Sequence, residues 1–281
     1  MDTRTLVDGL RFPEGPRWRE GRLWFSDIHD ERVRSVDLDG HVETIVEVPG
    51  QPSGLGWLPD GRMLVVSMVD QRLLRLENGK LVEVADLSAH ATFHCNDMLV
   101  DAQGRAYVGN FGWDIFAEGG GTPRDADLLL VEPDGRVRIA ADGLTFPYGT
   151  VLTPDGRTLI IGETYAARLT AFDVADDGSL SNRRVWAQLD GAVPDGICLD
   201  AEGAVWVASP ISGAALRIRE GGEVAARVAV EHQTFACMLG GPERKHLFLC
   251  TARDADPTVC RAERSGRIEV VEVEVPGAGL P

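Results

Sequence analysis

A turn that ends in glycine and leads into an apolar strand recurs along this chain, and this repeat limits the possible folds more than any other feature. Clear copies read REGRLWFSD, LPDGRMLVVS, DAQGRAYVGN, TPDGRTLIIGE and DAEGAVWVAS, and a degenerate sixth reads GPERKHLFLCTA. The turn glycines are spaced 40, 43, 52 and 47 residues apart, at Gly21, Gly61, Gly104, Gly156 and Gly203. A period of this length indicates a solenoid, a propeller or another array of one structural unit.

A second family of glycine turns alternates with the first. Its copies read DLDG, ENG, EPDG, DDG, EGG and RSG, at 37–40, 77–79, 132–135, 176–178, 220–222 and 264–266. Asp-Gly and Asn-Gly turns between alternating strands are typical of β-hairpins, because their backbone needs positive φ. Each unit therefore reads as four strands, which over roughly 45 residues is the period of a propeller blade.

We therefore predict an all-β fold, a six-bladed β-propeller with four antiparallel strands per blade, formed by residues 1–281 as a single domain. No segment shows helical periodicity over a useful length. Residues 3–10 and 267–275 both resemble a strand that could complete the last blade, and the pattern leaves open which of them does so.

Composition narrows the class of protein. The net charge of −16 argues against binding to nucleic acid or to an anionic membrane surface, since both require a basic footprint. The five cysteines form no Cys-x-x-Cys pair, and most lie in apolar runs, which indicates reduced core residues. The first residues lack the apolar core of a signal peptide. We expect a cytoplasmic protein that acts on a small molecule.

The residues that begin each innermost strand are the candidate site. Strands alternate direction within a blade, so these residues converge on the central channel. They lie seven or eight residues before each turn glycine, at Glu14, Ser53, Asn96, Tyr148 and Asp195, with Ala236 in the last blade by alignment. Most share a Pro-x-Gly frame in which only the central residue varies, and this variation indicates a functional site.

The acidic and amide side chains in this set suit a hard divalent cation. The carboxylates of Glu14 and Asp195 and the amide oxygen of Asn96 are oxygen donors, which Ca²⁺, Mg²⁺ and Mn²⁺ prefer and Zn²⁺ or Fe²⁺ tolerate. The alternative is that these polar residues only solvate a wet channel.

Several stretches together resemble the gluconolactonase/regucalcin-like (senescence marker protein) family of six-bladed propellers. They read LRFPEGPRW, HCND, FPYGTVLTPDGRTLIIGET, PDGICLDAEGAVWVA and FACMLGGPERKHLF, and they span nearly the whole chain. The resemblance implies a metal-dependent lactonase, a carboxylic ester hydrolase with one divalent cation, Ca²⁺ first and otherwise Zn²⁺, Mn²⁺, Mg²⁺ or Fe²⁺. It also implies that a Glu, two Asn and an Asp hold the cation, and three of these correspond to Glu14, Asn96 and Asp195.

Two positions depart from the family pattern. Tyr148 stands where the family has its second Asn, so three readings stay open: weaker metal binding completed by waters, Tyr148 as an acid or phenolate ligand, or loss of the metal. His94 stands two residues before Asn96, where sugar-lactonase members often carry an Arg, which disfavours a sugar-acid lactone. His94 is either a base beside the metal or a packed surface residue.

For the lactone that the resemblance implies, the chemistry of the site residues suggests their roles as a hypothesis. A metal-activated water would attack the lactone carbonyl, with Asp195 as general base. Tyr148 would donate to the developing oxyanion or to the leaving oxygen, and His94 is a further catalytic candidate.

An insertion in blade three is predicted to rise on the metal face. It reads FGWDIFAEGGGTPRDAD at 111–127, and its apolar side chains with a glycine-rich centre favour a lid, the alternative being a mobile surface loop. His29, Met68 and Tyr165 are expected on the same face. The candidates for substrate contact are Ser53, His94, Trp113, Phe116, Tyr148 and Phe235. This aromatic rim favours an apolar or aromatic ring substrate over a polyol.

Two other functions remain open. One is a metal-independent propeller enzyme, similar to strictosidine synthase, that uses Tyr148 and Glu14 for acid-base chemistry. The other is a non-catalytic propeller that binds a small molecule, since a fold does not determine a function. A serine nucleophile is disfavoured, because the chain has no G-x-S-x-G elbow.

Overall fold

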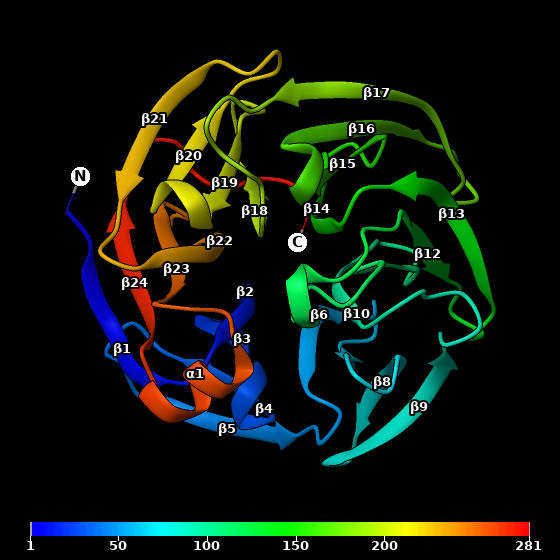
Figure 1. Cartoon of the computed structure of the whole chain (residues 1–281), viewed down its shortest axis with the longest axis horizontal. Coiled ribbons are helices and arrows are strands. Elements are labelled where there is room, and N and C mark those ends of the chain that lie inside the picture. The colour runs from blue at the N-terminus through cyan, green and yellow to red at the C-terminus, as the bar shows by residue number, and fades with distance from the viewer. Residues whose placement is uncertain (1, 281) are drawn as a thin grey trace.

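Six four-stranded antiparallel sheets surround a central axis in the computed structural model, which describes residues 2–280 (Figure 1). The prediction of an all-β six-bladed propeller is confirmed. In blades one to five the first strand in sequence is innermost and the later strands follow outward, whereas in blade six β22 is innermost and β1 is outermost. Blades one to three contain β2 (Pro13–Arg19), β3 (Arg22–Asp27), β4 (Arg32–Val36) and β5 (Val42–Glu47); β6 (Pro52–Trp57), β7 (Met63–Ser67), β8 (Arg72–Glu77) and β9 (Lys80–Asp86); and β10 (Cys95–Val100), β11 (Ala106–Asn110), β12 (Ala126–Val131) and β13 (Val137–Leu144).

Blades four to six complete the ring in the same way. They contain β14 (Pro147–Leu152), β15 (Thr158–Glu163), β16 (Arg168–Val174) and β17 (Leu180–Gln188); β18 (Ile197–Leu199), β19 (Val205–Ser209), β20 (Ala214–Ile218) and β21 (Val224–Ala229); and β22 (Gln233–Gly240), β23 (His246–Ala252), β24 (Gly266–Glu272) and β1 (Arg4–Leu10). No helix of the described residues has the length and apolar composition that crossing a membrane requires.

Both terminal segments take part in closing the ring. β24 is the third strand of blade six, and β1 pairs with it as the outermost fourth strand, with Arg4 opposite Val270 and Leu10 opposite Gly266. The sequence pattern left open whether residues 3–10 or 267–275 complete the last blade, and the structure shows that both segments contribute a strand to it. The non-covalent pairing of the two chain ends therefore closes the propeller.

The link between the second and third strands of blade six corrects two expectations. It holds a short helix, α1 (Pro257–Glu263), where no helix was predicted. Pro257 at the first turn and the Asp256 side chain, which accepts hydrogen bonds from the N–H groups of Thr258 and Val259, explain why it forms. The RSG turn at 264–266 follows this helix and precedes the third strand, so it is not the hairpin turn that was predicted.

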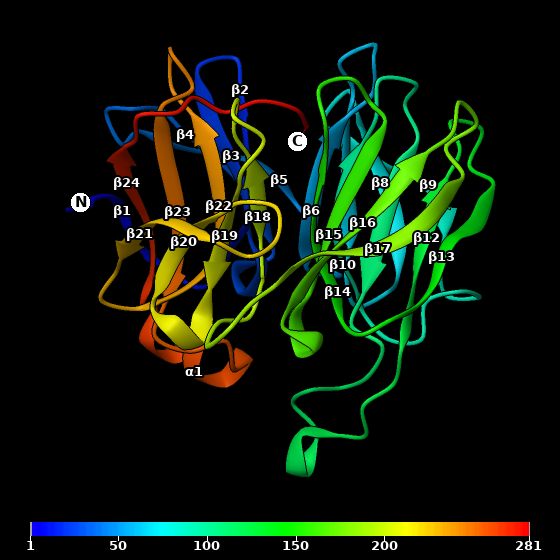
Figure 2. The same cartoon turned by 90° about the horizontal axis from the view of Figure 1, so that it is seen from above.

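The links between second and third strands all lie on one face of the propeller, together with the starts of the innermost strands. Four of them carry short 3-10 turns, η1 (Ile28–Asp30), η2 (Glu118–Gly120), η3 (Thr164–Ala166) and η4 (Pro210–Ser212). Figure 2 shows α1 and the long insertion of blade three on the same side of the molecule. The insertion spans 111–125 rather than 111–127, because β12 begins at Ala126. Its action as a lid stays a prediction.

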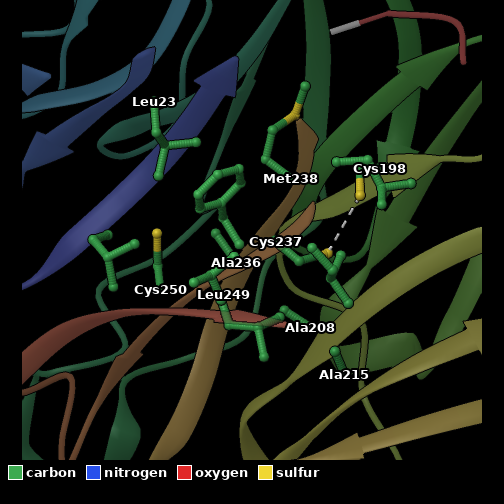
Figure 3. Close-up of a cluster of buried hydrophobic side chains, with 14 of the residues drawn as sticks. Leu23, Cys198, Ala208, Ala215, Ala236, Cys237, Met238, Leu249 and Cys250 are labelled. Atoms are coloured by element: carbon green, nitrogen blue, oxygen red, sulfur yellow. Dashed lines mark hydrogen bonds between the residues drawn. The ribbon is translucent and has the colours of Figure 1, made fainter. Parts of the chain in front are cut away.

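The apolar core lies between the packed faces of neighbouring blades. A large cluster joins blades five, six and one, and Figure 3 shows the side chains of Leu23, Met238 and Leu249 within it. The sulfur atoms of Cys198 and Cys237 lie 3.8 Å apart in this cluster. All five cysteines are buried and none forms a disulfide, as the sequence predicted.

The glycine of the Pro-x-Gly frame has a physical reason in this packing. A Cβ added at Gly15 would lie 2.7 Å from the Ser53 carbonyl oxygen in the next blade. Similar contacts recur around the ring. A Cβ added at Gly54 would lie 2.8 Å from the Asp97 carbonyl carbon, and one added at Gly149 would lie 2.9 Å from the Ile197 nitrogen. A Cβ added at Gly196 would lie 2.6 Å from the Ala236 Cβ. Glycine therefore allows adjacent innermost strands to approach closely enough to close the ring.

We expect Gly54→Ala to lower the free energy of unfolding by about 3 kcal/mol or more, because the added methyl meets backbone that no rotamer change can move. Gly9→Ala is the control: it lies at φ 70° with nothing within 4 Å of the added carbon, so only backbone strain of about 1–2 kcal/mol is expected. Chemical denaturation of both variants measures the difference. Equal losses would contradict the close-approach explanation.

Candidate active site

An apolar cavity of about 380 Å³ opens on the axis, on the face that carries the links. Every blade contributes to its lining. The polar lining residues are Glu14, His29, Tyr148, Thr164 and Asp195. The others are Phe12, Ile28, Met68, Phe111, Ile115, Phe116, Phe146, Tyr165, Val193, Pro210, Ile211, Phe235 and Ala255. A larger hollow of about 1090 Å³ lies between turns of blades three and four on the opposite face, and no predicted site residue lines it.

Glu14 is a buried carboxyl at the second position of β2. Its Oε2 accepts a hydrogen bond from the N–H of Gly15 at 2.8 Å. Burial raises its pKa to about 8, and the charge of Asp97 adds to the rise, against lowering by the Gly15 hydrogen bond and by a hydrogen bond from Tyr148. A carboxyl in this state is mostly protonated at neutral pH unless a cation stabilises its charge.

Tyr148 occupies the same position in β14 and faces Glu14 across the channel. Burial raises its pKa well above the usual value, and the negative charges of Glu14 and Asp195 raise it further. The phenol is therefore neutral in the protein without a cation. A neutral phenol can donate a hydrogen bond, so the local charges favour Tyr148 as a donor over Tyr148 as a phenolate ligand.

Asp195 precedes β18 and completes the floor of the cavity. The residue keeps partial exposure, but its carboxylate meets the apolar cavity, and desolvation followed by the charges of Glu14 and Asp97 raises its pKa well above the usual value. Its backbone N–H donates to the carbonyl of Ala208 at 3.0 Å, which fixes its position next to β19. Two carboxylates thus repel each other in a poorly solvated place.

Asn96, the third predicted metal ligand, is the second residue of β10. It is fully buried, and its Nδ2 donates to the carbonyl of Pro147 at 2.9 Å. Its Oδ1 is buried without a hydrogen-bond partner among the described residues, and buried carbonyl oxygens of this kind normally have one. Asn96 is not part of the cavity lining.

The donor set fits a hard divalent cation. An unpartnered amide oxygen and two carboxylates with raised pKa values all lose an unfavourable interaction when a cation binds beside them. Among the described residues, the one group of three His, Cys or acidic side chains with ligand atoms within 4.8 Å of each other lies elsewhere, at Asp37, Asp39 and His41. That group is a turn whose own hydrogen bonds to Asp37 account for its geometry.

Arg17 and Asp97 form a buried ion pair that the sequence reasoning missed. Arg17 Nη2 lies 2.6 Å from Asp97 Oδ1, and both side chains are about nine-tenths buried. Arg17 also donates from Nε to the Leu55 carbonyl at 3.0 Å and from Nη2 to the Met98 carbonyl at 2.6 Å. The pair thereby connects blades one, two and three beside the site. The one available signal was that C-N-D in blade three replaces the frame glycine with Asp97.

Three of the predicted substrate residues lie outside the cavity wall. Ser53 is buried at the axis, and its carbonyl accepts a hydrogen bond from the Ser26 hydroxyl at 2.6 Å. His94 stacks on Phe93 with ring centres 4.0 Å apart, and desolvation lowers its pKa. Trp113 packs behind the lining, with its Nε1 donating to the Gly120 carbonyl at 3.2 Å. Phe116, Tyr148 and Phe235 do line the cavity.

Two aromatic walls face each other across the axis. The first wall consists of Phe111, Phe146, Tyr148 and Tyr165 from blades three and four, and the Phe111 and Phe146 rings stack at 4.8 Å and 6°. The second wall consists of Phe12, His29 and Phe235 from blades one and six, with Phe12 and Phe235 at 4.8 Å. These blade pairs lie on opposite sides of the ring (Figure 1).

Exposed apolar side chains surround the mouth of the cavity. Phe116, Tyr165 and Ile211 are 46%, 58% and 67% exposed, and all three belong to the lining. The sequence analysis placed Phe116 and Tyr165 on this face but did not identify Ile211, which lies in η4, the link that follows β19. Apolar groups on a rim are typical of a binding site.

Comparison with known proteins gives a consistent result. The model of the SMP-30/Gluconolactonase/LRE-like region matches residues 12–253. Regucalcin from Danio rerio is 27% identical over 282 residues, covering 94% of this chain and 92% of that protein. A pentonolactonase from Haloferax volcanii is 26% identical, covering 89% and 84%. The crystal structure of a calcium-binding regucalcin from Agrobacterium tumefaciens superimposes with a TM-score of 0.80 at 23% identity, covering 100% of this chain and 96% of that one.

We expect Arg17→Met to lower the free energy of unfolding by about 3–5 kcal/mol, because Asp97 keeps a buried charge without a partner. The double variant Arg17→Met/Asp97→Leu removes both charges and should recover most of this loss. Chemical denaturation of the two variants measures both the loss and the recovery of the free energy of unfolding. A double variant no more stable than the single one would show that hydrogen bonds from Arg17 to the backbone, and not the ion pair, stabilise this region.

Proposed function

This chain belongs to the SMP-30/gluconolactonase/LRE-like family, and on that premise we propose that it is a metal-dependent hydrolase that opens a lactone or a related cyclic ester. The family includes lactonases, of which the Haloferax pentonolactonase is a distant relative. The observation that carries the proposal is the pair of destabilised carboxylates, Glu14 and Asp195, at the floor of an apolar cavity.

The proposed metal ligands are Glu14, Asp195 and Asn96. Ca²⁺ is the first candidate, because the donors are oxygen atoms and a regucalcin among the similar structures is described as calcium-binding. A divalent cation at this site would polarise the ester carbonyl and lower the pKa of a water molecule. Asn96 would contribute its Oδ1, which has no hydrogen-bond partner among the described residues.

The chain's own residues supply the proton transfers. Asp195 accepts the proton of the attacking water as general base, once its carboxylate is ionised. Tyr148 donates a hydrogen bond to the oxygen that gains negative charge, either the carbonyl oxygen or the leaving oxygen. The neutral state of the phenol supports this role. The apolar lining excludes bulk water, which strengthens both interactions.

The proposed substrate carries an apolar or aromatic substituent. The two aromatic walls provide flat apolar surfaces on opposite sides of the cavity. Few polar side chains line it, and His94, at the position where sugar lactonases often have an Arg, lies outside the wall. A polyol would lose hydrogen bonds to water in this cavity and regain few of them.

A second candidate function is metal-independent acid-base catalysis by Tyr148 and Glu14. The observation in its favour is that the Tyr148 phenol and the Glu14 carboxyl act on each other's pKa, together with a Glu14 pKa of about 8 in the absence of a cation. A carboxyl with this pKa could act as acid or base near neutral pH. A non-catalytic propeller that binds an apolar ligand in the same cavity is the third candidate.

The test of the main proposal is metal content and hydrolysis of a lactone panel, before and after chelation. We expect turnover to fall with chelation and to return on adding Ca²⁺ or another divalent cation. Asp195→Asn should lower kcat/KM by about 10²-fold or more, because the general base is lost. Asp37→Asn, in the acidic turn on the opposite face, is the matched control and should retain activity. Full turnover by Asp195→Asn would disprove the base assignment, and turnover unaffected by chelation would favour the metal-independent mechanism.

Tyr148 variants separate its possible roles. Tyr148→Phe should lower kcat by about 10²-fold while metal content stays unchanged, because a hydrogen-bond donor to the transition state is lost. Tyr148→Asn should tighten metal binding, measured by calorimetry, because it restores the amide that the family has at this position. Loss of metal in Tyr148→Phe would show instead that the tyrosine oxygen is a ligand.

A further inference from the structure

His29 is a buried polar residue of the cavity wall to which the proposed reaction gives no role. It belongs to η1, the link of blade one, and only 5% of it is exposed. Its Nδ1 is buried without a hydrogen-bond partner among the described residues. Of the buried side-chain atoms in this state, only those of His29 and Thr164 belong to the cavity lining, and Thr164 is less buried.

Backbone hydrogen bonds fix the link that carries His29, and a ring contact supports its imidazole. The His29 carbonyl accepts a hydrogen bond from Arg11 Nη1 at 3.0 Å, and the N–H of Ile28 donates to the Phe12 carbonyl at 3.0 Å. The imidazole ring packs on the Phe12 ring with centres 5.4 Å apart. A polar group held this firmly in a binding cavity is preorganised for a ligand, because little further ordering is needed on binding.

His29 is separate from the floor of the cavity. It lies in a link, whereas Glu14, Tyr148 and Asp195 lie where the innermost strands begin. The charged groups that act on the imidazole are Arg261, Asp256 and Arg11, none of them from the floor. A substrate with its ester at the floor would therefore present another part of its ring to His29.

The imidazole is uncharged at neutral pH. Burial, followed by the positive charge of Arg261, lowers its pKa to about 4. A neutral imidazole offers one donor and one acceptor; a hydroxyl group can pair with either, and a carbonyl group can accept from the donor. A charged substituent would instead have to give up its hydration in a cavity lined mostly by apolar side chains.

We propose that His29 is a specificity-determining residue that hydrogen-bonds an uncharged polar substituent, a hydroxyl or carbonyl group, on the ring of the substrate. This inference rests on the proposed function for the identity of the substrate as a cyclic ester. The two aromatic walls hold the ring, and His29 in the second wall distinguishes a substituted ring from an unsubstituted one. A site built to hydrogen-bond a substituent discriminates strongly against the analogue that lacks it.

The experiment compares a benzo-fused six-membered lactone with its ring-hydroxylated isomers. In the wild-type protein we expect at least one isomer to have a kcat/KM about tenfold or more above that of the unsubstituted lactone. In His29→Leu this ratio should fall to near unity, and in His29→Gln, which keeps hydrogen-bonding atoms, part of it should return. General effects of a substitution on folding or chemistry act on both substrates and cancel in the ratio.

Met68→Leu is the matched control, since Met68 lines the same cavity and carries no hydrogen-bonding group comparable to an imidazole. It should leave the ratio unchanged. A ratio equal in the wild type and in His29→Leu would overturn the inference, and so would a wild type with no preference for any hydroxylated isomer.

Binding of the corresponding lactams separates this inference from the proposed function. If the wild type hydrolyses none of the lactones, the proposed function has failed, and the same ratio is then measured from the Kd values of the lactams by tryptophan fluorescence. A hydroxyl preference in Kd that is lost in His29→Leu supports the role of His29 in recognition. No such preference, or no binding of the lactams, overturns it.

Discussion

The close approach of the innermost strands around the axis is the constraint on which the rest of this structure depends. Six innermost strands have to converge closely enough for neighbouring blades to pack. A side chain at the third position of the Pro-x-Gly frame would hold two of these strands apart. Gly15, Gly54, Gly149 and Gly196 remove that side chain at four of the contacts. The residue directly before each of these glycines then lies at the axis, so the requirement for closure also places the candidate site.

Blade three meets the constraint in a different way, and the site depends on this difference. Asp97 takes the place of the frame glycine, and its carboxylate pairs with Arg17 from blade one. One buried negative charge is thereby balanced, whereas Glu14 and Asp195 have no comparable cationic partner among residues 2–280 and their pKa values rise. The guanidinium of Arg17 balances the charge of Asp97. The carboxylates of Glu14 and Asp195 are left for an external cation to stabilise.

Much of the fold and part of the site could be predicted from the sequence, because the blades repeat and the axial residues occupy the same position in each repeat. The turn glycines require positive φ, and the five that mark the blades have φ values between 71° and 86°. The repeat phase placed Glu14, Tyr148 and Asp195 at the axis, where they form the floor of one cavity. It also placed Ser53, His94 and Trp113 near this face, but it could not determine that each packs away from the cavity. The direction of a side chain depends on its neighbours from other blades, which no periodicity within one blade describes.

The sequence by itself determined the number of blades, the face that carries the site and the residue types at its centre, since these follow from spacing and from local turn chemistry. Only the tertiary structure decided how the ring closes, which carboxylate has an internal partner and which polar groups remain unpartnered. β1 pairs with β24 from opposite ends of the chain, Arg17 reaches Asp97 from another blade, and His29 lines one cavity together with residues from the other five blades. Burial and charge pairing at the axis arise from contacts between residues far apart in the chain, so they exist only once the six blades are assembled.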